Sequence, residues 1–329
     1  MSGIRQSEDY RFIDIFKFFC AFLIIGIHSA PFLKMGILDN VFSMVTKIAV
    51  PFFFISSSFF LFRKEFSWKR IAGYCKRVLL LYVIYSTFYV VYELLCGQFV
   101  LNGFLIKFFI SGYQHLWFLQ QSVIAVLFIA LILRLFKKPW LLYTIAIVFY
   151  IIGILLFTYR PLVNDISIVQ AYHRSMVSQI IFERSWIFYA VPYMAIGYYF
   201  ANNSFVKKSY SVVGTIVFFT LLAVEGFIGI NILHTSYTVL WFSVIPLSFF
   251  LFSFVAQVNV KKDFNTVILR KLSTLIYCIH LLVVFLLNYL DFPLHILLFV
   301  SASIISLFYS VIILKLSSLK YFKFLKVLY

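Results

Sequence analysis

The sequence has little charge, and very little of it is negative. Charged residues make up only 12% of its 329 residues, and Asp and Glu together number 11. Hydrophobic residues make up 64%, Phe alone accounts for 43 positions, and the mean hydropathy is +1.02. A soluble globular chain is about half apolar and about a quarter charged, and its surface cannot hide so much apolar area. We therefore exclude a soluble protein and predict an integral membrane protein.

Cysteine is also scarce, and no two cysteines have CxxC spacing. The four residues lie in or beside apolar runs: Cys20, Cys75, Cys96 and Cys278. We therefore expect small buried side chains, with no disulfide framework and no metal site. The sequence also lacks a Gly-rich phosphate loop and an internal repeat, and its first twelve residues do not have the pattern of a cleavable signal peptide.

The positive charge is distributed along the chain in a way that indicates membrane topology. The net charge is +17, which on a soluble domain would suggest a nucleic-acid partner. Here the Lys and Arg residues cluster in short loops between apolar runs, as they do in membrane proteins. We therefore exclude nucleic acid as a partner and expect contact with membrane lipid.

Ten apolar runs have the length of a membrane-spanning helix. They cover residues 12–33, 44–62, 78–96, 116–134, 140–158, 186–202, 210–230, 238–257, 272–290 and 293–314. The sequence thus predicts an all-α, polytopic bundle of about ten transmembrane helices, forming a single domain over 1–329. Segment 99–110 is too short to cross a membrane, so we expect an interfacial or re-entrant piece.

The distribution of Lys and Arg predicts which side each loop faces. With the N-terminus in the cytoplasm, 21 of the 28 Lys and Arg residues fall on the inner side. The outer side then holds six: Lys34, Lys47, Lys107, Arg160, Arg174 and Arg184. This asymmetry predicts cytoplasmic termini at both ends and an even number of spans. We expect a multi-pass protein of the cell membrane.

The first apolar run contains three ionisable residues, Asp14, Lys17 and His28. On a helix, Lys17 and His28 differ by only about 20° around the axis and lie about 16 Å apart along it. Asp14 is on the same side, at a spacing that permits an ion pair with Lys17. An ion pair near the inner interface and an interfacial histidine would explain each group separately. Ionisable residues within a span are functional candidates, however, and these form one stripe.

Other polar residues lie within or beside later spans. The candidates for substrate binding, besides Asp14, are Ser56 in the second run, His115 and Trp117 at the start of the fourth, Glu183 at the mouth of the sixth, and His280 within the ninth. Each also has a structural explanation: close helix packing for the serines of 56–58, an interfacial anchor for Trp117 and a solvated pair for Glu183 with Arg184. The longest outer loop, 159–185, is where we expect a polar substrate to be recognised.

Six segments, in this order, resemble the acyltransferase-3 family of membrane acyltransferases. They are RFIDIFKFFCAFLIIGIHS, VPFFFISSSFFL, the basic KRIAGYCKRVLL, HLWFL, ERSWIFYAVPYMAIGYY and STLIYCIH. The resemblance covers essentially the whole chain. It implies a bundle of about ten helices that moves an acyl group, usually acetyl, from cytoplasmic acyl-CoA to a hydroxyl of a cell-envelope glycan or lipid-linked sugar.

The resemblance also implies roles for individual residues. The family has a basic residue, ten residues and then histidine in its first helix, which correspond to Lys17 and His28, although Arg is commoner at the first position. We expect His28 to act as general base or transient acyl carrier, and Arg184 to orient the acceptor or the developing oxyanion. Together with Lys17, an inner-loop basic cluster is expected to bind the CoA phosphates: Lys69, Arg70, Lys76 and Arg77.

Three functions compete at this point. The first is O-acetylation of an exported polysaccharide or other envelope glycan, with acetyl-CoA as co-substrate and no metal. The second is a transporter of a small polar substrate such as an amino acid, because membrane domains resembling this family are fused to serine racemases. The third is a polysaccharide exporter or anchor without catalysis. The acceptor, the acyl chain length and the oligomeric state stay open.

Overall fold

The computed structural model describes residues 10–175, 178, 182–234, 238–261, 265–292 and 295–329. Over these ranges the regular structure is helical throughout, with no strand. The long helices are α1 (Arg11–Ser29), α4 (Trp68–Leu95), α6 (Trp117–Phe136), α7 (Pro139–Leu156), α12 (Lys208–Asn231), α14 (Val267–Tyr289) and α15 (His295–Ser318). The all-α polytopic fold expected from composition is confirmed.

Shorter elements connect or extend these helices. They are α2 (Ile37–Thr46), α3 (Ala49–Phe62), α5 (Leu101–Ile106), the π-helix η1 (Lys107–Ser111), the 3₁₀ turn η2 (Gln114–Leu116), α8 (Arg160–Val163), α9 (Ser167–Arg174), the π-helix η3 (Trp186–Ala190), α11 (Val191–Asn202), α13 (Val244–Ala256) and the 3₁₀ helix η4 (Lys320–Leu328). Segment 99–110 thus forms a short helical piece before α6, and its relation to the membrane stays a prediction.

In the described ranges, eight helical stretches are long and apolar enough to cross a membrane. One combines α2 and α3 over Ile37–Phe62, so the helical stretch starts seven residues before the expected 44–62. The other two expected spans are helical but shorter: residues 186–202 are divided between η3 and α11, and α13 has 13 residues. The expected number of about ten therefore depends on these two shorter helices.

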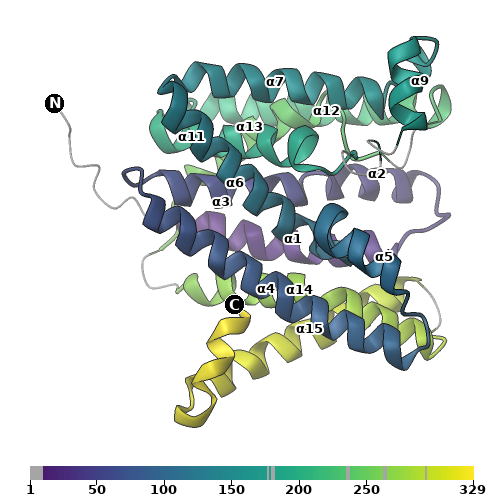
Figure 1. Ribbon diagram of the computed structural model, residues 1–329, viewed down its shortest axis with the longest axis vertical. Coiled ribbons are helices and arrows are strands. Elements are labelled where there is room, and N and C mark those ends of the chain that lie inside the picture. Colours follow the sequence, from purple (N-terminus) through teal and green to yellow (C-terminus); the bar gives the residue numbers. More distant parts are fainter. Residues whose placement is uncertain (1–9, 176–177, 179–181, 235–237, 262–264, 293–294) are drawn as a thin grey trace.

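The helices lie roughly parallel in layers around α1 and α3 (Figure 1). In this view α7, α11, α12 and α13 form the upper layer, and α4, α14 and α15 form the lower one. Helix α1 packs against α14, α3 and α15, while α3 packs closely against α11. The ionisable first helix is therefore central to the bundle, as its polar stripe requires.

Small residues permit the close contact between α3 and α11. A Cβ at Gly197 of α11 would lie 2.3 Å from the carbonyl oxygen of Ile55 and 2.7 Å from Cβ of Ser58. The hydroxyl of Ser58 donates a 2.6 Å hydrogen bond to the carbonyl oxygen of Met194. Small side chains let helix backbones approach closely, so the expectation of close packing at the serines of α3 is confirmed, with α11 as the partner.

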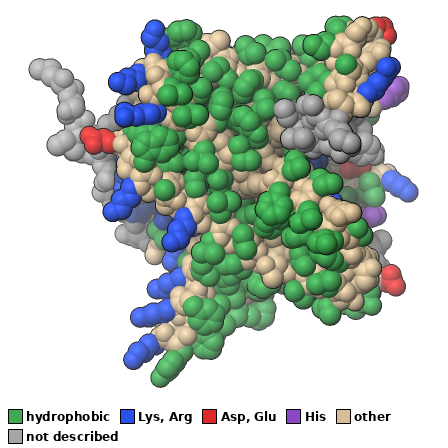
Figure 2. Space-filling view, viewed as in Figure 1, with side chains coloured by type: hydrophobic (Ala, Val, Ile, Leu, Met, Phe, Trp, Pro, Cys, Tyr) green, Lys and Arg blue, Asp and Glu red, His purple; other side chains and the backbone are tan. Residues whose placement is uncertain are grey.

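Basic side chains gather at one end of the bundle. Figure 2 shows most of the visible Lys and Arg side chains along the end that includes the α3–α4 connection and η4, whereas the opposite end has His side chains and charged side chains of both signs. Such an asymmetry is typical of membrane proteins whose basic end faces the cytoplasm. We refer to these two ends as the basic end and the opposite end.

Candidate functional site

Three histidines from three different helical elements form a cluster inside the bundle. The ring centroids of His115 and His280 are 4.5 Å apart, and the ring of His28 lies 5.3 Å from that of His280 and 6.0 Å from that of His115. His115 and His280 are buried, and His28 is partly exposed. The structure thus brings together three residues that lie up to 252 positions apart in the sequence.

One backbone carbonyl orients two of the three rings. The carbonyl oxygen of Tyr277 lies 2.7 Å from Nε2 of His115 and 2.8 Å from Nδ1 of His280. A carbonyl oxygen only accepts, so both of these nitrogens carry a proton. In the neutral rings, Nδ1 of His115 and Nε2 of His280 are therefore acceptors, and both are buried without a hydrogen bond in the described structure.

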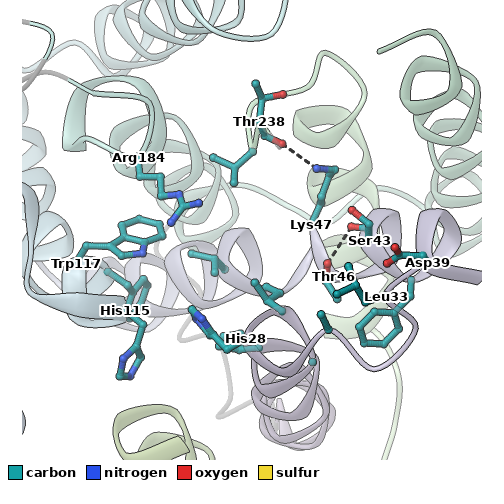
Figure 3. Close-up of a pocket in the computed structure, with 18 of the residues that line it drawn as sticks. His28, Leu33, Asp39, Ser43, Thr46, Lys47, His115, Trp117, Arg184 and Thr238 are labelled. Atoms are coloured by element: carbon teal, nitrogen blue, oxygen red, sulfur yellow. Dashed lines mark hydrogen bonds between the residues drawn. The ribbon is translucent and has the colours of Figure 1, made fainter. Parts of the chain in front are cut away.

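A cavity of about 470 Å³ opens beside this cluster (Figure 3). His28, His115, Trp117 and Arg184 line it, whereas His280 lies behind the first two. No hydrogen bond holds His28 among the described residues, in contrast to the other two rings. His28 is consequently the ring best placed to contact a molecule in the cavity.

The turn before α6 explains how His115 and Trp117 reach the cavity. Gly112 has a φ of +89°, and a Cβ there would lie 2.2 Å from Cα of Trp117, so only glycine fits. The turn then continues through η2, which contains His115, into Trp117, the first residue of α6. The hydroxyl of Tyr277 donates a 2.6 Å hydrogen bond to the carbonyl oxygen of His115 and fixes the turn against α14.

Glu183 and Arg184 are adjacent in sequence, but only Arg184 lines the cavity. The carboxylate of Glu183 accepts hydrogen bonds from the backbone N–H groups of Val239 and, at 3.2 Å, Leu240, and it does not line the cavity. Burial raises the pKa of Glu183, and these two N–H groups oppose the shift. Arg184 lines the cavity, with its guanidinium 5.9 Å from the ring centroid of Trp117.

The polar residues nearer the basic end lie outside this cavity. The ammonium of Lys17 is 5.6 Å from the ring centroid of Phe53, and Asp14 accepts a 3.2 Å hydrogen bond from the hydroxyl of Thr266. Ser56 donates to the carbonyl oxygen of Phe53 within its own helix. The structure thus places Asp14 and Ser56 in helix packing and shows no contact between either of them and the cavity.

Aromatic rings connect Lys17 with the histidine cluster. The ring of Phe53 is 6.2 Å from that of Tyr277, and the ring of Tyr277 is 5.1 Å from that of His115. Phe118 completes this group, 6.0 Å from Phe53 and 5.6 Å from Tyr277. The stripe expected on α1 therefore has its two ends on either side of an aromatic layer.

A second, shallow cavity of about 510 Å³ lies on α4 near the basic end. Its lining includes Lys69, Arg70 and Arg77, three of the four basic residues expected to bind phosphate. Nη1 of Arg70 is buried and makes no hydrogen bond in the described structure. Lys76, the fourth, is exposed and does not line this cavity.

The cavity lining includes a cation that was not among the sequence candidates. Lys47 was counted only among the outer-side cations, although it falls within the expected run 44–62, and the structure places it at the break between α2 and α3, lining the first cavity. The sequence signal was a lysine near the start of an apolar run, which the structure extends to Ile37 on its N-terminal side. His173 of the long loop, by contrast, lies 3.0 Å from the carbonyl oxygen of Leu156, outside the cavity.

Comparisons with known proteins place the sequence among its relatives. The sequence profile of the acyltransferase-3 family, an acyltransferase domain, matches residues 10–315. Two curated proteins of Enterococcus faecalis, both named amino-acid racemase, are 28% identical over 63% of the chain and 25% identical over 83% of it. The matches span 30% and 40% of those longer proteins. No solved structure gives a significant match.

Proposed function

Because the chain belongs to the acyltransferase-3 family of membrane acyltransferases, we propose that it is an O-acetyltransferase of the cell membrane. In this proposal the acetyl group comes from cytoplasmic acetyl-CoA, and the acceptor is a hydroxyl of an exported polysaccharide, cell-envelope glycan or lipid-linked sugar. The observation that carries the proposal is His28 at the wall of the first cavity, with Arg184 lining the same space.

The residues around His28 suit acyl transfer to a hydroxyl. A general base must reach the proton that it removes, and His28 is the ring of the cluster that lines the cavity without a hydrogen bond to the backbone. The imidazole would take the hydroxyl proton as the oxygen attacks the thioester carbonyl. It would return that proton to the CoA sulfur as the C–S bond breaks, so the products are the O-acetyl ester and free CoA. The guanidinium of Arg184 would orient the acceptor or stabilise the negative oxygen that develops.

The donor is proposed to approach from the basic end. Arg70 has a buried nitrogen without a hydrogen-bond partner in the described part of the chain, as expected of a site that takes an anion. Lys17 lies further along α1, beside Phe53 and the aromatic layer. We propose that the CoA phosphates bind at Arg70 and Arg77, and that the pantetheine arm passes Lys17 toward His28.

Replacement of Arg70 tests the phosphate site. We expect Arg70→Gln to raise the KM for acetyl-CoA about tenfold, because a charge-assisted hydrogen bond to phosphate contributes about 1.5–3 kcal/mol. Lys76→Gln is the matched control, since it removes a positive charge from the same helix outside the cavity. Equal effects of the two variants in a membrane assay would contradict a specific phosphate site and indicate only a diffuse electrostatic effect.

The function itself is tested by following two radiolabels in parallel. Membranes that contain the protein and the native glycan receive acetyl-CoA labelled either in the acetyl group or in the CoA part. We expect acetyl label, and no CoA label, in the envelope glycan, and neither label with membranes that lack the protein. Acetyl label absent from the glycan in both membranes would refute the proposal.

A second candidate is transport or modification of an amino acid. It is favoured by the likeness to two proteins named amino-acid racemase. A transporter would accumulate labelled amino acid in vesicles without consuming acetyl-CoA. The basic cavity on α4 favours acyl transfer over this alternative, because an amino-acid carrier has no need of a phosphate site at the basic end.

A further inference from the structure

The first cavity contains a second cation besides Arg184. Lys47 donates a 2.8 Å hydrogen bond from Nζ to the carbonyl oxygen of Thr238, and this ammonium lies 5.0 Å from the ring centroid of Trp241. The carbonyl occupies one of the three N–H donors of an ammonium group. Lys47 is thus held in position by the backbone while donors stay available for a bound molecule.

Neither cation forms an ion pair in the described structure. Glu183 and Glu225 are near enough to act on the charge of Lys47. However, Glu183 accepts from the N–H groups of Val239 and Leu240. The oxygens of Glu225 likewise accept from two backbone N–H groups and from a hydroxyl, those of Phe242, Ser243 and Tyr159.

The cavity wall has one carboxylate of its own, and it is also engaged. Asp39 accepts a 3.2 Å hydrogen bond from the backbone N–H of Lys34. Figure 3 shows Asp39 on the far side of the cavity from Arg184, with Lys47 between them and both cations across from His28. Two cations thus face His28 across the cavity without a direct ion pair in the described part of the chain, in a region where a membrane protein keeps charge only with a partner or water.

We propose that Lys47 and Arg184 bind an anionic group, a carboxylate or a phosphate, of the acceptor while its hydroxyl lies at His28. This rests on the proposed function and specifies its substrate: a glycan with an acidic sugar or a phosphodiester, rather than a neutral one. Lys47 contributes a point charge with free donors, and Arg184 a planar fork that pairs with two oxygens.

Paired acceptors test the proposal. Membranes with the protein receive labelled acetyl-CoA and one of three acceptors: an oligosaccharide with uronic acid residues, the same oligosaccharide with its carboxyls reduced to alcohols, or a glycerol phosphate oligomer. We expect the wild type to prefer one of the two anionic acceptors over the reduced one by about tenfold or more in kcat/KM. The preferred anionic acceptor distinguishes carboxylate from phosphate.

Substitution at Lys47 gives the second readout. We expect Lys47→Gln to raise the KM for the preferred anionic acceptor about tenfold, with the kinetics of the reduced acceptor unchanged, and Lys47→Arg to restore much of the loss. Lys34→Gln is the control, because Lys34 is an exposed residue that does not line the cavity. Equal use of charged and reduced acceptors by the wild type, or an equal effect of Lys47→Gln on both, would overturn the proposal.

The two proposals fail in different ways. If the wild type labels neutral and anionic acceptors equally, the acyltransferase proposal stands and the anion site fails. If it labels none of them, the acyltransferase proposal fails. The anion site is then tested separately, by calorimetric titration of the purified protein with each anionic acceptor. Binding of the uronic acid oligosaccharide or the glycerol phosphate oligomer, weakened by Lys47→Gln, would support the site, and no binding of either would refute it.

Discussion

His28→Ala is expected to abolish acyl transfer, lowering the rate of acetyl incorporation into glycan at least about 100-fold. A positioned general base contributes about 10²–10⁴ to a rate, and alanine leaves neither base nor nucleophile at this wall of the cavity. The measurement is the initial rate of label transfer from acetyl-CoA in membranes with matched amounts of protein. An unchanged rate would remove His28 from the mechanism.

The control for this variant is His295→Ala. His295 is exposed at the start of α15 and does not line the cavity, so its replacement removes an imidazole without changing the site. A loss of activity through misfolding is recognised by comparing thermal unfolding of the purified variants. His28→Gln serves as a second variant, because glutamine keeps polar atoms in the site but cannot act as a base near neutral pH.

The same assay separates the two roles expected for His28. An acyl carrier would leave acetyl label covalently on the protein when acceptor is withheld, and hydroxylamine would release that label. A general base would leave the protein unlabelled under the same conditions. Because His115 and His280 each use one nitrogen to hold the carbonyl oxygen of Tyr277, we expect their replacement to act by displacing His28 rather than by removing the reacting group.

Local patterns in the sequence predicted the parts of this site that belong to a single helix. Composition and apolar run length predict the all-α membrane fold, and helical periodicity predicts that Lys17 and His28 share one side of α1. A polar residue within an apolar span, such as His280, is noticeable because it is costly there. These signals depend only on nearby residues, so they can be recognised without knowledge of the fold.

These local patterns do not predict contacts between segments that are distant in the sequence. Nothing local to His115 indicates that its ring meets His280, 165 positions later, at a carbonyl of α14. Asp14 has the same intramembrane signal as His28, yet it accepts a hydrogen bond from Thr266 outside the cavity. Lys47 lies within the expected run 44–62 but was counted only as an outer-side charge, because the sequence does not show that the break between α2 and α3 faces a cavity.

Gly197→Ala is expected to destabilise the bundle by about 1–3 kcal/mol or more, the usual range for overpacking a tight contact. The added Cβ would lie 2.3 Å from the carbonyl oxygen of Ile55 and 3.0 Å from the backbone nitrogen of Phe59. These are backbone atoms of α3, which cannot rotate away as the end of a side chain can. Relief therefore requires α3 and α11 to separate.

The measurement is the apparent melting temperature of the purified protein in detergent, with Gly73→Ala as the control. A Cβ at Gly73, on α4, meets nothing within 4 Å, so alanine there should leave stability unchanged or raise it slightly, since alanine favours helix. Equal melting temperatures for the Gly197→Ala variant and the wild type would contradict the close contact between α3 and α11.

The Gly197 contact also bears on the site. Helix α11 continues directly from η3, whose residue Tyr189 lines the first cavity, and the first backbone N–H of η3 donates a 2.8 Å hydrogen bond to the side chain of Gln121 on α6. Arg184 lies two residues before η3, so moving α11 would move this cation relative to His28.

We therefore expect the folded fraction of Gly197→Ala to transfer acetyl more slowly than the wild type, and Gly197→Val to lose both folding and activity. If the folded fraction keeps full activity, α11 packing sets stability alone and Arg184 is positioned by α6 through Gln121.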